Sequence, residues 1–421
     1  MTVEQNPDEV VFSKRGVALN VTLFDLLLVL VLVAGAFFRF SGLFWGEYNY
    51  LHPDERFLLQ VGSSITPVVC SDPNYSDYNC PPESKRYLSL SEYFDTANSP
   101  LNPHNRGATF YVYGTLPMFI ARLAVEWVFG HSGWVEMTQV GRTLSALFDL
   151  LVVLLVYLTA ERLFDRRVAI LAAAFSAAAV LQIQQSHFFT TDTFINFFAL
   201  LTFYFAARIV SGDWAASEQP AQALQAEREG YALGDSPYNL GFSAQARPAT
   251  ALQRFLQHPL FLPCLAFGIA LGMAVASKLN AAPVAVVLPI ALGLRLMQAT
   301  PGERQGYFNQ AVVFTLLAAV VSLVTFRILQ PYAFSGPGFF NISLNPQWLS
   351  NLRELAAQTS GEVDFPPAMQ WARRGVTFSG KNLILWGLGL PLGLLAFGGL
   401  IWAGWRLLHG WNERGRTWQH T

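Results

Sequence analysis

Eight long apolar runs constrain the fold of this 421-residue chain more than any other feature. Each is roughly 20 residues long, the length that an α-helix needs to cross the hydrocarbon core of a bilayer. Backbone polar groups inside a bilayer must be satisfied within the structure, so we expect these runs to be helices. The sequence therefore predicts an all-α polytopic membrane protein. The runs lie near residues 21–43, 142–163, 168–186, 192–210, 259–277, 281–298, 310–330 and 382–408.

The composition agrees with residence in a membrane. Hydrophobic residues make up 52% of the chain and charged residues 13%, about half the charged share of an ordinary soluble domain. The net charge of −1 gives no reason to expect a nucleic-acid partner. The first run follows Lys14 and Arg15, and no small-residue cleavage site follows it. We therefore expect an uncleaved first helix with a cytoplasmic N-terminus.

A ninth apolar run, residues 108–129, is ambiguous because Arg122 and Glu126 are costly inside lipid. A helix of this kind is better placed at the membrane surface. The link 161–167 carries three arginines, and the positive-inside rule places it in the cytoplasm. With a cytoplasmic N-terminus, the chain must cross the membrane an even number of times to return to that side at residue 161. This count is met only if residues 108–129 do not cross the membrane.

This topology divides the chain into four parts and leaves both ends in the cytoplasm. The transmembrane module contains a long extracytoplasmic loop, 44–141, and a cytoplasmic linker, 211–258, whose polar composition is typical of a solvated segment. The parts are a cytoplasmic N-terminus at 1–20, the transmembrane module at 21–330, an extracytoplasmic loop at 331–381, and the last transmembrane helix with its tail at 382–421.

The three cysteines fall into two groups. Cys264 lies in an apolar run and is predicted to be inert core. Cys70 and Cys80 share the polar outer loop, so a disulfide between them is plausible if that loop faces an oxidising compartment. Two free thiols remain the alternative.

The segment His52-Pro-Asp-Glu55 follows the first apolar run directly and has two interpretations. Proline followed by two acids is an ordinary helix start, because proline has a suitable φ and carboxylates favour the positive end of the helix dipole. Paired carboxylates at a membrane surface could also accept a proton from a substrate hydroxyl or hold a divalent ion. Asp54 and Glu55 are therefore candidate catalytic residues, with His52 beside them.

A second polar cluster, Ser186 to Asp192, forms the turn between two predicted spans on the same side of the membrane. Thr191 or Asp192 could simply cap the next helix. His187 and Asp192 are nevertheless candidate substrate-binding residues, because the topology places this turn on the same face as Asp54.

Single cations mark three further spans near that face: Arg142, Lys278 and Arg327. Any one of them could extend to the membrane interface. Together they would suit a phosphate, with arginine as a bidentate fork and lysine as a point charge. His104 and Arg106 precede the interfacial helix, and Tyr332 follows Arg327; these three complete the set of candidate binding residues.

The combination resembles the GT-C membrane glycosyltransferases, and within them family 39 and the protein O-mannosyltransferases. The resemblance covers about residues 40–330. It rests on the acidic pair Asp54-Glu55 in a long outer loop, an interfacial helix, Arg142, the basic link Arg162–Arg167, and the turn Ser186–Asp192.

This resemblance implies a GT-C-type helix bundle that transfers a sugar, with inversion, from a polyprenyl-phosphate donor to an acceptor hydroxyl on a protein or glycan. The active site would face outward, beside membrane lipid. By position, Asp54 would be the general base, and Glu55 would bind the acceptor or tune that base. Arg142 and Asp192 would hold the site and Lys278 would bind phosphate. No cofactor is certain, although a divalent metal ion remains open.

Two other functions remain as alternatives, a transporter or flippase of lipid-linked substrates and a catalytically inactive GT-C-like subunit. A transporter would place its charges at the membrane midplane within repeated halves, whereas these polar residues lie at outer helix ends. The enzyme hypothesis predicts that Asp54, Arg142, Asp192 and Lys278 line one outward cavity.

Overall fold

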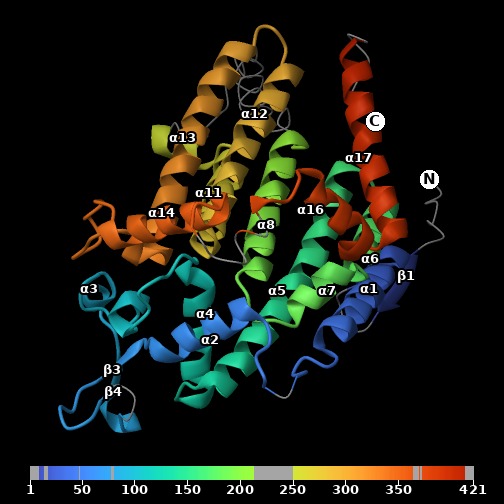
Figure 1. Ribbon diagram of the computed structural model, residues 1–421. Coiled ribbons are helices and arrows are strands. Elements are labelled where there is room, and N and C mark those ends of the chain that lie inside the picture. The colour runs from blue at the N-terminus through green and yellow to red at the C-terminus, as the bar shows by residue number, and fades with distance from the viewer. Residues whose placement is uncertain are drawn as a thin grey trace.

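The computed structural model describes residues 9–13, 18–46, 48–76, 80–212, 250–363, 369 and 372–412. These residues form a helical bundle, and the small elements between residues 65 and 106 lie together at one of its ends (Figure 1). Most of the predicted N-terminal segment, the cytoplasmic linker and the tail lie outside the described residues. The four-part division of the chain therefore remains a prediction.

Apolar helices occupy all eight predicted runs. Within the described residues, five are long and apolar enough to cross a membrane, and a sixth candidate is a pair of helices bent by 56°. The five are α1 (Leu23–Phe40), α5 (Trp134–Leu163), α8 (Asp192–Val210), η4 (Leu279–Val286) with α12 (Val287–Gln298), and α13 (Arg304–Leu329). The bent pair is α6 (Arg166–Ala177) and α7 (Val180–Ser186); α11 (Phe261–Ser277) and α17 (Leu390–Asn412) contain shorter apolar helices. The prediction of an integral, multi-pass protein is confirmed.

The ambiguous run contains α4 (Thr115–Phe129), which is not among the candidate spans. Its two charged residues are buried and paired, with Arg122 and Glu126 3.0 Å apart and Lys85 2.9 Å from Glu126. Trp127 lies on the opposite side and is 83% exposed. This one-sided burial agrees with the predicted surface helix.

The smaller elements connect the spans. The outer loop contains α2 (Pro53–Ser64), β3 (Val68–Cys70), η1 (Pro82–Ser84), β4 (Lys85–Tyr87), α3 (Leu90–Tyr93) and η2 (Pro103–Arg106). Elsewhere are β1 (Glu9–Ser13), β2 (Ala18–Thr22), α10 (Ala251–Leu256), η5 (Pro331–Ala333), α14 (Pro346–Ser360), α16 (Thr377–Asn382) and the π-helical turn η6 (Leu383–Gly387). The antiparallel pairs β1–β2 and β3–β4 were not predicted by the sequence. The disulfide between Cys70 and Cys80 is present, and Cys264 is buried and free, as expected.

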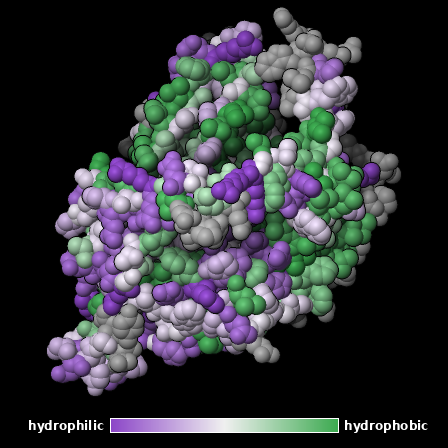
Figure 2. Space-filling model, in the orientation of Figure 1, coloured by the Kyte–Doolittle hydropathy of each residue, from purple (hydrophilic) through white to green (hydrophobic). Residues whose placement is uncertain are grey.

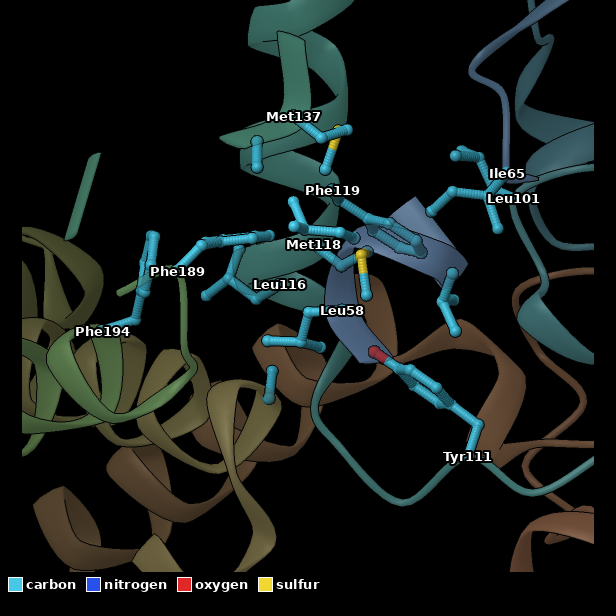
Figure 3. Close-up of a cluster of buried hydrophobic side chains, with 14 of the residues drawn as sticks. Leu58, Ile65, Leu101, Tyr111, Leu116, Met118, Phe119, Met137, Phe189 and Phe194 are labelled. Carbon is cyan, nitrogen blue, oxygen red and sulfur yellow. The ribbon is translucent and has the colours of Figure 1, made fainter. Parts of the chain in front are cut away.

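One hydrophobic core joins the outer loop to the bundle. Leu58 from α2, Met118 from α4, Met137 from α5 and Phe194 from α8 meet in it, with Phe189 from the turn before α8 (Figure 3). Figure 2 shows apolar surface over the bundle and more polar surface toward α2 and β3–β4 on this face. Because burying large apolar side chains is strongly favourable, this core fixes the loop relative to the helix ends.

Close helix packing holds the later spans together. α1 packs on α5 and α6, α5 on α8, α8 on α11, and α11 on α13. On α11, Gly268 and Gly272 face α13 so closely that an added Cβ would lie 2.6 Å from the Ala318 carbonyl oxygen and 2.7 Å from that of Ser322. Small residues four apart allow this approach of two membrane helices, where van der Waals packing supplies much of the attraction.

A buried ion pair stabilises the bend between α6 and α7. Arg39 on α1 lies 2.7 Å from Asp149 on α5, and both side chains are almost fully buried. The Arg39 guanidinium also donates to the carbonyls of Ala177 at 2.9 Å and Ser176 at 3.3 Å. These carbonyls lie at the interrupted end of α6, where backbone acceptors lose helical partners. Arg39 therefore donates hydrogen bonds both to a buried carboxylate and to the free carbonyl groups at a helix end.

We expect Arg39→Met to destabilise the protein more than Asp149→Asn. Either change breaks the buried ion pair, at a cost of about 3–5 kcal/mol. The methionine also leaves the carbonyls of Ala177 and Ser176 without a donor, whereas the asparagine variant keeps Arg39 bonded to both carbonyls. Thermal unfolding in detergent would compare the two variants. Equal melting temperatures would contradict this role for Arg39.

If the disulfide forms in the cell, only one of the three cysteines should carry a free thiol. Protein purified without reductant and then denatured should react with one maleimide, at Cys264, and with three after reduction. The Cys264→Ser variant is the control and should show none before reduction. Three reactive thiols in the unreduced protein would show that the outer loop does not form its disulfide in the cell.

Candidate functional site

The start of α2 is capped by a histidine rather than by either acid. The Nδ1 atom of His52, the N-cap residue, accepts the Glu55 backbone N–H at 3.4 Å, and Pro53 occupies the first helical position. Just before this cap, Tyr48 and Tyr50 have φ values of 61° and 50°. Bulky residues rarely adopt this left-handed conformation, and such strain tends to occur at functional sites. The helix-start interpretation is thus correct for Pro53 and for Asp54 and Glu55, which lie in the first turn, while His52 supplies the cap.

Glu55 is fully buried in an ion pair with Arg142. The Nε and Nη2 atoms of Arg142 donate to the two Glu55 carboxylate oxygens, each at 2.8 Å, and the Phe189 backbone N–H donates to the same group at 2.9 Å. The remaining Nη1 donates to the carbonyls of Leu43 and Trp45, each at 3.1 Å. This network ties α2, α5 and two connecting turns together, so its geometry favours a positioning role for both residues.

Asp54, on the next position of α2, lies in a different environment. Its side chain is partly exposed and interacts with the hydroxyl of Tyr113 by charge and hydrogen bonding. Burial, the charge of Asp54 and the nearby charge of Asp192 all raise the pKa of Tyr113. Tyr113 therefore stays protonated at physiological pH and can donate to a carboxylate.

The second carboxylate, Asp192, is paired with Lys278. The Lys278 Nζ lies 2.8 Å from Asp192 Oδ1, and both side chains remain about one third exposed. Thr191 is the N-cap residue of α8 but makes no capping hydrogen bond with its side chain. Asp192 therefore serves the ion pair, and the capping interpretation of this turn is not realised by either side chain.

Backbone contacts bring Tyr113 and Lys278 together. The N–H of Gly114 donates to the Ser277 carbonyl at 3.1 Å, so residues 113 and 278 flank a direct contact between the loop and the end of α11. A Cβ at Gly114 would lie only 2.0 Å from the Ala276 carbonyl oxygen, so this approach requires glycine. The next residue, Thr115, is fixed by Gln330, whose Oε1 accepts from its N–H at 2.6 Å and its hydroxyl at 2.7 Å.

Three of the four residues expected in one cavity are thus linked: Asp54 and Asp192 both act on Tyr113, and Lys278 pairs with Asp192. Arg142 lies beneath this group, buried against Glu55. Tyr113 was not among the predicted site residues, although the pair Tyr111-Val-Tyr113 marks two aromatic side chains just before the surface helix. The two rings lie 6.3 Å apart, and their hydroxyls have different partners: Tyr111 donates to the Gly114 carbonyl, while Tyr113 interacts with Asp54.

Two of the other candidates hold turns by backbone contacts. The ring nitrogens of His187 lie 2.7 Å from the Ile183 carbonyl and 3.0 Å from the Ser41 carbonyl. The guanidinium of Arg327 donates to the carbonyls of Phe339, Gly338 and Pro331. These contacts favour structural roles for both side chains, and their contact with substrate remains a prediction.

The remaining candidates lie in the loops around the core. The buried Tyr332 hydroxyl is 2.7 Å from that of Ser99. His104 has Nδ1 2.7 Å from the Ala108 carbonyl, and burial lowers its pKa, so it is held neutral at physiological pH. Arg106 is partly exposed on η2. Their roles in binding also remain predictions.

A metal site has less support from the geometry. Among the described residues, no three His, Cys, Asp or Glu side chains form a group that could hold a metal ion. Lys278 already provides the cation beside Asp192. The divalent ion therefore remains a prediction without a ligand set.

Comparison with known proteins supports the resemblance inferred from the residues. Residues 116–216, which run from α4 to just beyond α8, match the family model described as dolichyl-phosphate-mannose-protein mannosyltransferase. This match contains Arg142, His187 and Asp192 and confirms the resemblance over that part of the chain. The comparison with curated proteins gave no match.

Solved structures show more distant similarity. The apo oligosaccharyltransferase of Archaeoglobus fulgidus is 15% identical, with a TM-score of 0.42; the alignment covers 86% of this chain and 36% of that one. The complex of the same enzyme with Zn and sulfate is 15% identical, with a TM-score of 0.43; that alignment covers 91% of this chain and 40% of the other. The S. cerevisiae protein O-mannosyltransferase Pmt1–Pmt2 complex bound to the sugar donor is 16% identical, with a TM-score of 0.41. The alignment covers 79% of this chain and 39% of that one. This chain thus spans less than half the length of each.

The contrast between the two adjacent acids can be tested by stability. Glu55→Gln keeps the side-chain shape but leaves Arg142 buried without a counter-charge, which should cost about 3–5 kcal/mol of unfolding free energy. Asp54→Asn is the matched control; it is partly exposed and should cost about 1 kcal/mol or less. Thermal unfolding in detergent measures both. Similar stability of the two variants would contradict the positioning role of Glu55.

Proposed function

We propose that the protein is an inverting glycosyltransferase that moves a sugar from a polyprenyl-phosphate donor to an acceptor hydroxyl. One observation carries the proposal: a partly exposed carboxylate, Asp54, and a partly exposed lysine, Lys278, are linked through Tyr113 and Asp192. Asp54 and Asp192 both act on Tyr113, and Asp192 pairs with Lys278. Sugar transfer from a phosphate needs a base and a cation in this kind of proximity. The family match of residues 116–216 supports the same class of reaction.

Asp54 is the proposed general base. The acceptor hydroxyl gives its proton to an Asp54 oxygen as its own oxygen forms a bond to the anomeric carbon of the sugar. The bond from that carbon to the phosphate oxygen breaks on the opposite face, which inverts the configuration. Tyr113 donates to the Asp54 carboxylate and so holds its orientation, because the hydroxyl stays protonated.

Lys278 is the proposed partner of the leaving phosphate. The departing group takes the bonding electrons and gains negative charge, which a fixed ammonium stabilises without reorganisation. Asp192 holds the ammonium at 2.8 Å before substrate arrives. The contact of Gly114 with Ser277 sets Lys278 against the loop that carries Tyr113, so base and cation keep a fixed separation.

The extracytoplasmic face is the proposed location of this site. The arginine-rich link 161–167 favours the cytoplasm for the opposite helix ends. The outer loop that carries Asp54 also contains the Cys70–Cys80 disulfide, and disulfides persist in oxidising compartments. A lipid-linked donor and an acceptor protein or glycan would meet there.

The Asp54→Asn variant should lower sugar transfer by about 10²–10⁴-fold, the usual contribution of a general base, while the protein inserts and folds normally. The measurement is transfer of radiolabelled mannose from a polyprenyl-phosphate donor to acceptors in membranes, with the sugar chosen from the family match. Glu83→Gln, an exposed acid of the same loop, is the matched control and should keep full activity.

Full turnover in Asp54→Asn would remove this residue as the base. Movement of the donor across the bilayer by the wild-type protein, with no transfer of its sugar, would favour the transport alternative instead. Circular dichroism and size-exclusion profiles of each variant keep loss of chemistry distinct from loss of fold.

A further inference from the structure

A hollow lies at the opposite end of the bundle from Asp54. It has a volume of about 320 Å³ and is lined by Leu158, Glu161 and Arg162 of α5, and by Tyr204 of α8 and the adjacent Ser211. α8 begins at Asp192 and has 19 residues, so roughly 28 Å of helix separates its two ends. The hollow is therefore remote from the proposed transfer site.

The charges around this hollow are not balanced. Glu161 is paired with Arg166 at 3.0 Å and accepts from Tyr157 at 3.3 Å. Arg162 donates from Nε to the Ser211 hydroxyl at 2.8 Å but has no carboxylate partner in the described part of the chain. Within the described residues, Nε is the only guanidinium nitrogen of Arg162 that donates a hydrogen bond.

A second arginine is placed on the same side. Arg208 is exposed on α8, four residues after Tyr204 and three before Ser211, a spacing that puts all three on one helix face. Arg208 likewise has no carboxylate partner within the described ranges. Arg162 thus lines the hollow from α5, and Arg208 lies on the face of α8 that carries two of its lining residues, Tyr204 and Ser211. The forked donors of a guanidinium match phosphate oxygens.

The surroundings of the hollow are apolar. Leu158 forms part of its wall. At the end of α5, Leu163 is 47% exposed and Phe164 is 63% exposed. On α8, Phe203, which precedes Tyr204 in the chain, is 45% exposed. A polar hollow with cations at the end of membrane-spanning helices, beside exposed apolar side chains, suits an amphiphile. Its phosphate would reach the arginines while its chains remain in the bilayer.

We propose that this hollow binds a phosphate group, and that an anionic phospholipid of the adjacent leaflet supplies it. Arg162 and Arg208 donate to the phosphate oxygens, and the Tyr204 hydroxyl lies within the same lining. The lipid bridges α5 and α8, two helices that pack against each other. Binding therefore stabilises the bundle, since a ligand that binds only the folded state raises its stability. This site is independent of the sugar-transfer proposal.

The test uses the full chain in a neutral detergent. Melting temperature is measured against increasing dioctanoyl-phosphatidylglycerol, dioctanoyl-phosphatidylcholine and inorganic phosphate. Phosphatidylglycerol should raise the melting temperature saturably, and the other two should not. The Arg162→Gln/Arg208→Gln double variant should lose at least about tenfold in apparent affinity, the effect of one charge-assisted hydrogen bond.

Arg353→Gln, an exposed arginine on α14, is the matched control and should keep the full lipid effect. If the double variant does not fold, Arg208→Gln alone provides the test, because this exposed side chain has no ion pair to lose within the described chain. An equal shift with inorganic phosphate would overturn the lipid assignment. An equal shift with phosphatidylcholine, or a full shift in the folded arginine variants, would overturn the site itself.

Discussion

The ion pair between Glu55 and Arg142 is the interaction on which the proposed site depends. Its three partners beyond the pair are backbone groups of Phe189, Leu43 and Trp45. A buried carboxylate and guanidinium are costly to desolvate, and the cost is offset only when nearly every donor and acceptor is used. Because these groups are used, the pair fixes the start of α2 against α5 and the turn before α8.

Two adjacent carboxylates thereby take different roles. Successive residues on a helix point about 100° apart, so a helix start anchored by Glu55 turns Asp54 toward Tyr113. Glu55 is fully buried and fully bonded, whereas Asp54 remains accessible. An acid–base residue needs access to substrate together with a fixed orientation. From the sequence pattern alone, Asp54 and Glu55 were equal candidates for a catalytic role. Only their environments in the fold distinguish the two acids.

The sequence predicted the fold well because apolar length and charge bias are local signals. It located all eight runs and a further helix within 108–129. It also named Asp192 and Lys278, which form an ion pair. It could not assign Arg142 or Arg327, because a single arginine near a helix end looks the same whether it reaches the interface or binds buried groups. Tyr113 was missed for a related reason: its partner is 59 positions away in sequence, and no local pattern encodes that contact.

The cations near the helix ends show why lysine is the better candidate for binding the substrate phosphate. Arg39, Arg142 and Arg327 are all nearly buried, and each donates to backbone carbonyls where the chain leaves regular helix. The planar, five-donor guanidinium suits this use because it satisfies several fixed acceptors at once. Lys278 instead makes one ion pair and keeps about a third of its side chain exposed. A point charge with a single, accessible partner can turn toward an incoming phosphate without leaving buried carbonyls unsatisfied, whereas any of the three arginines would have to break the fold to do so.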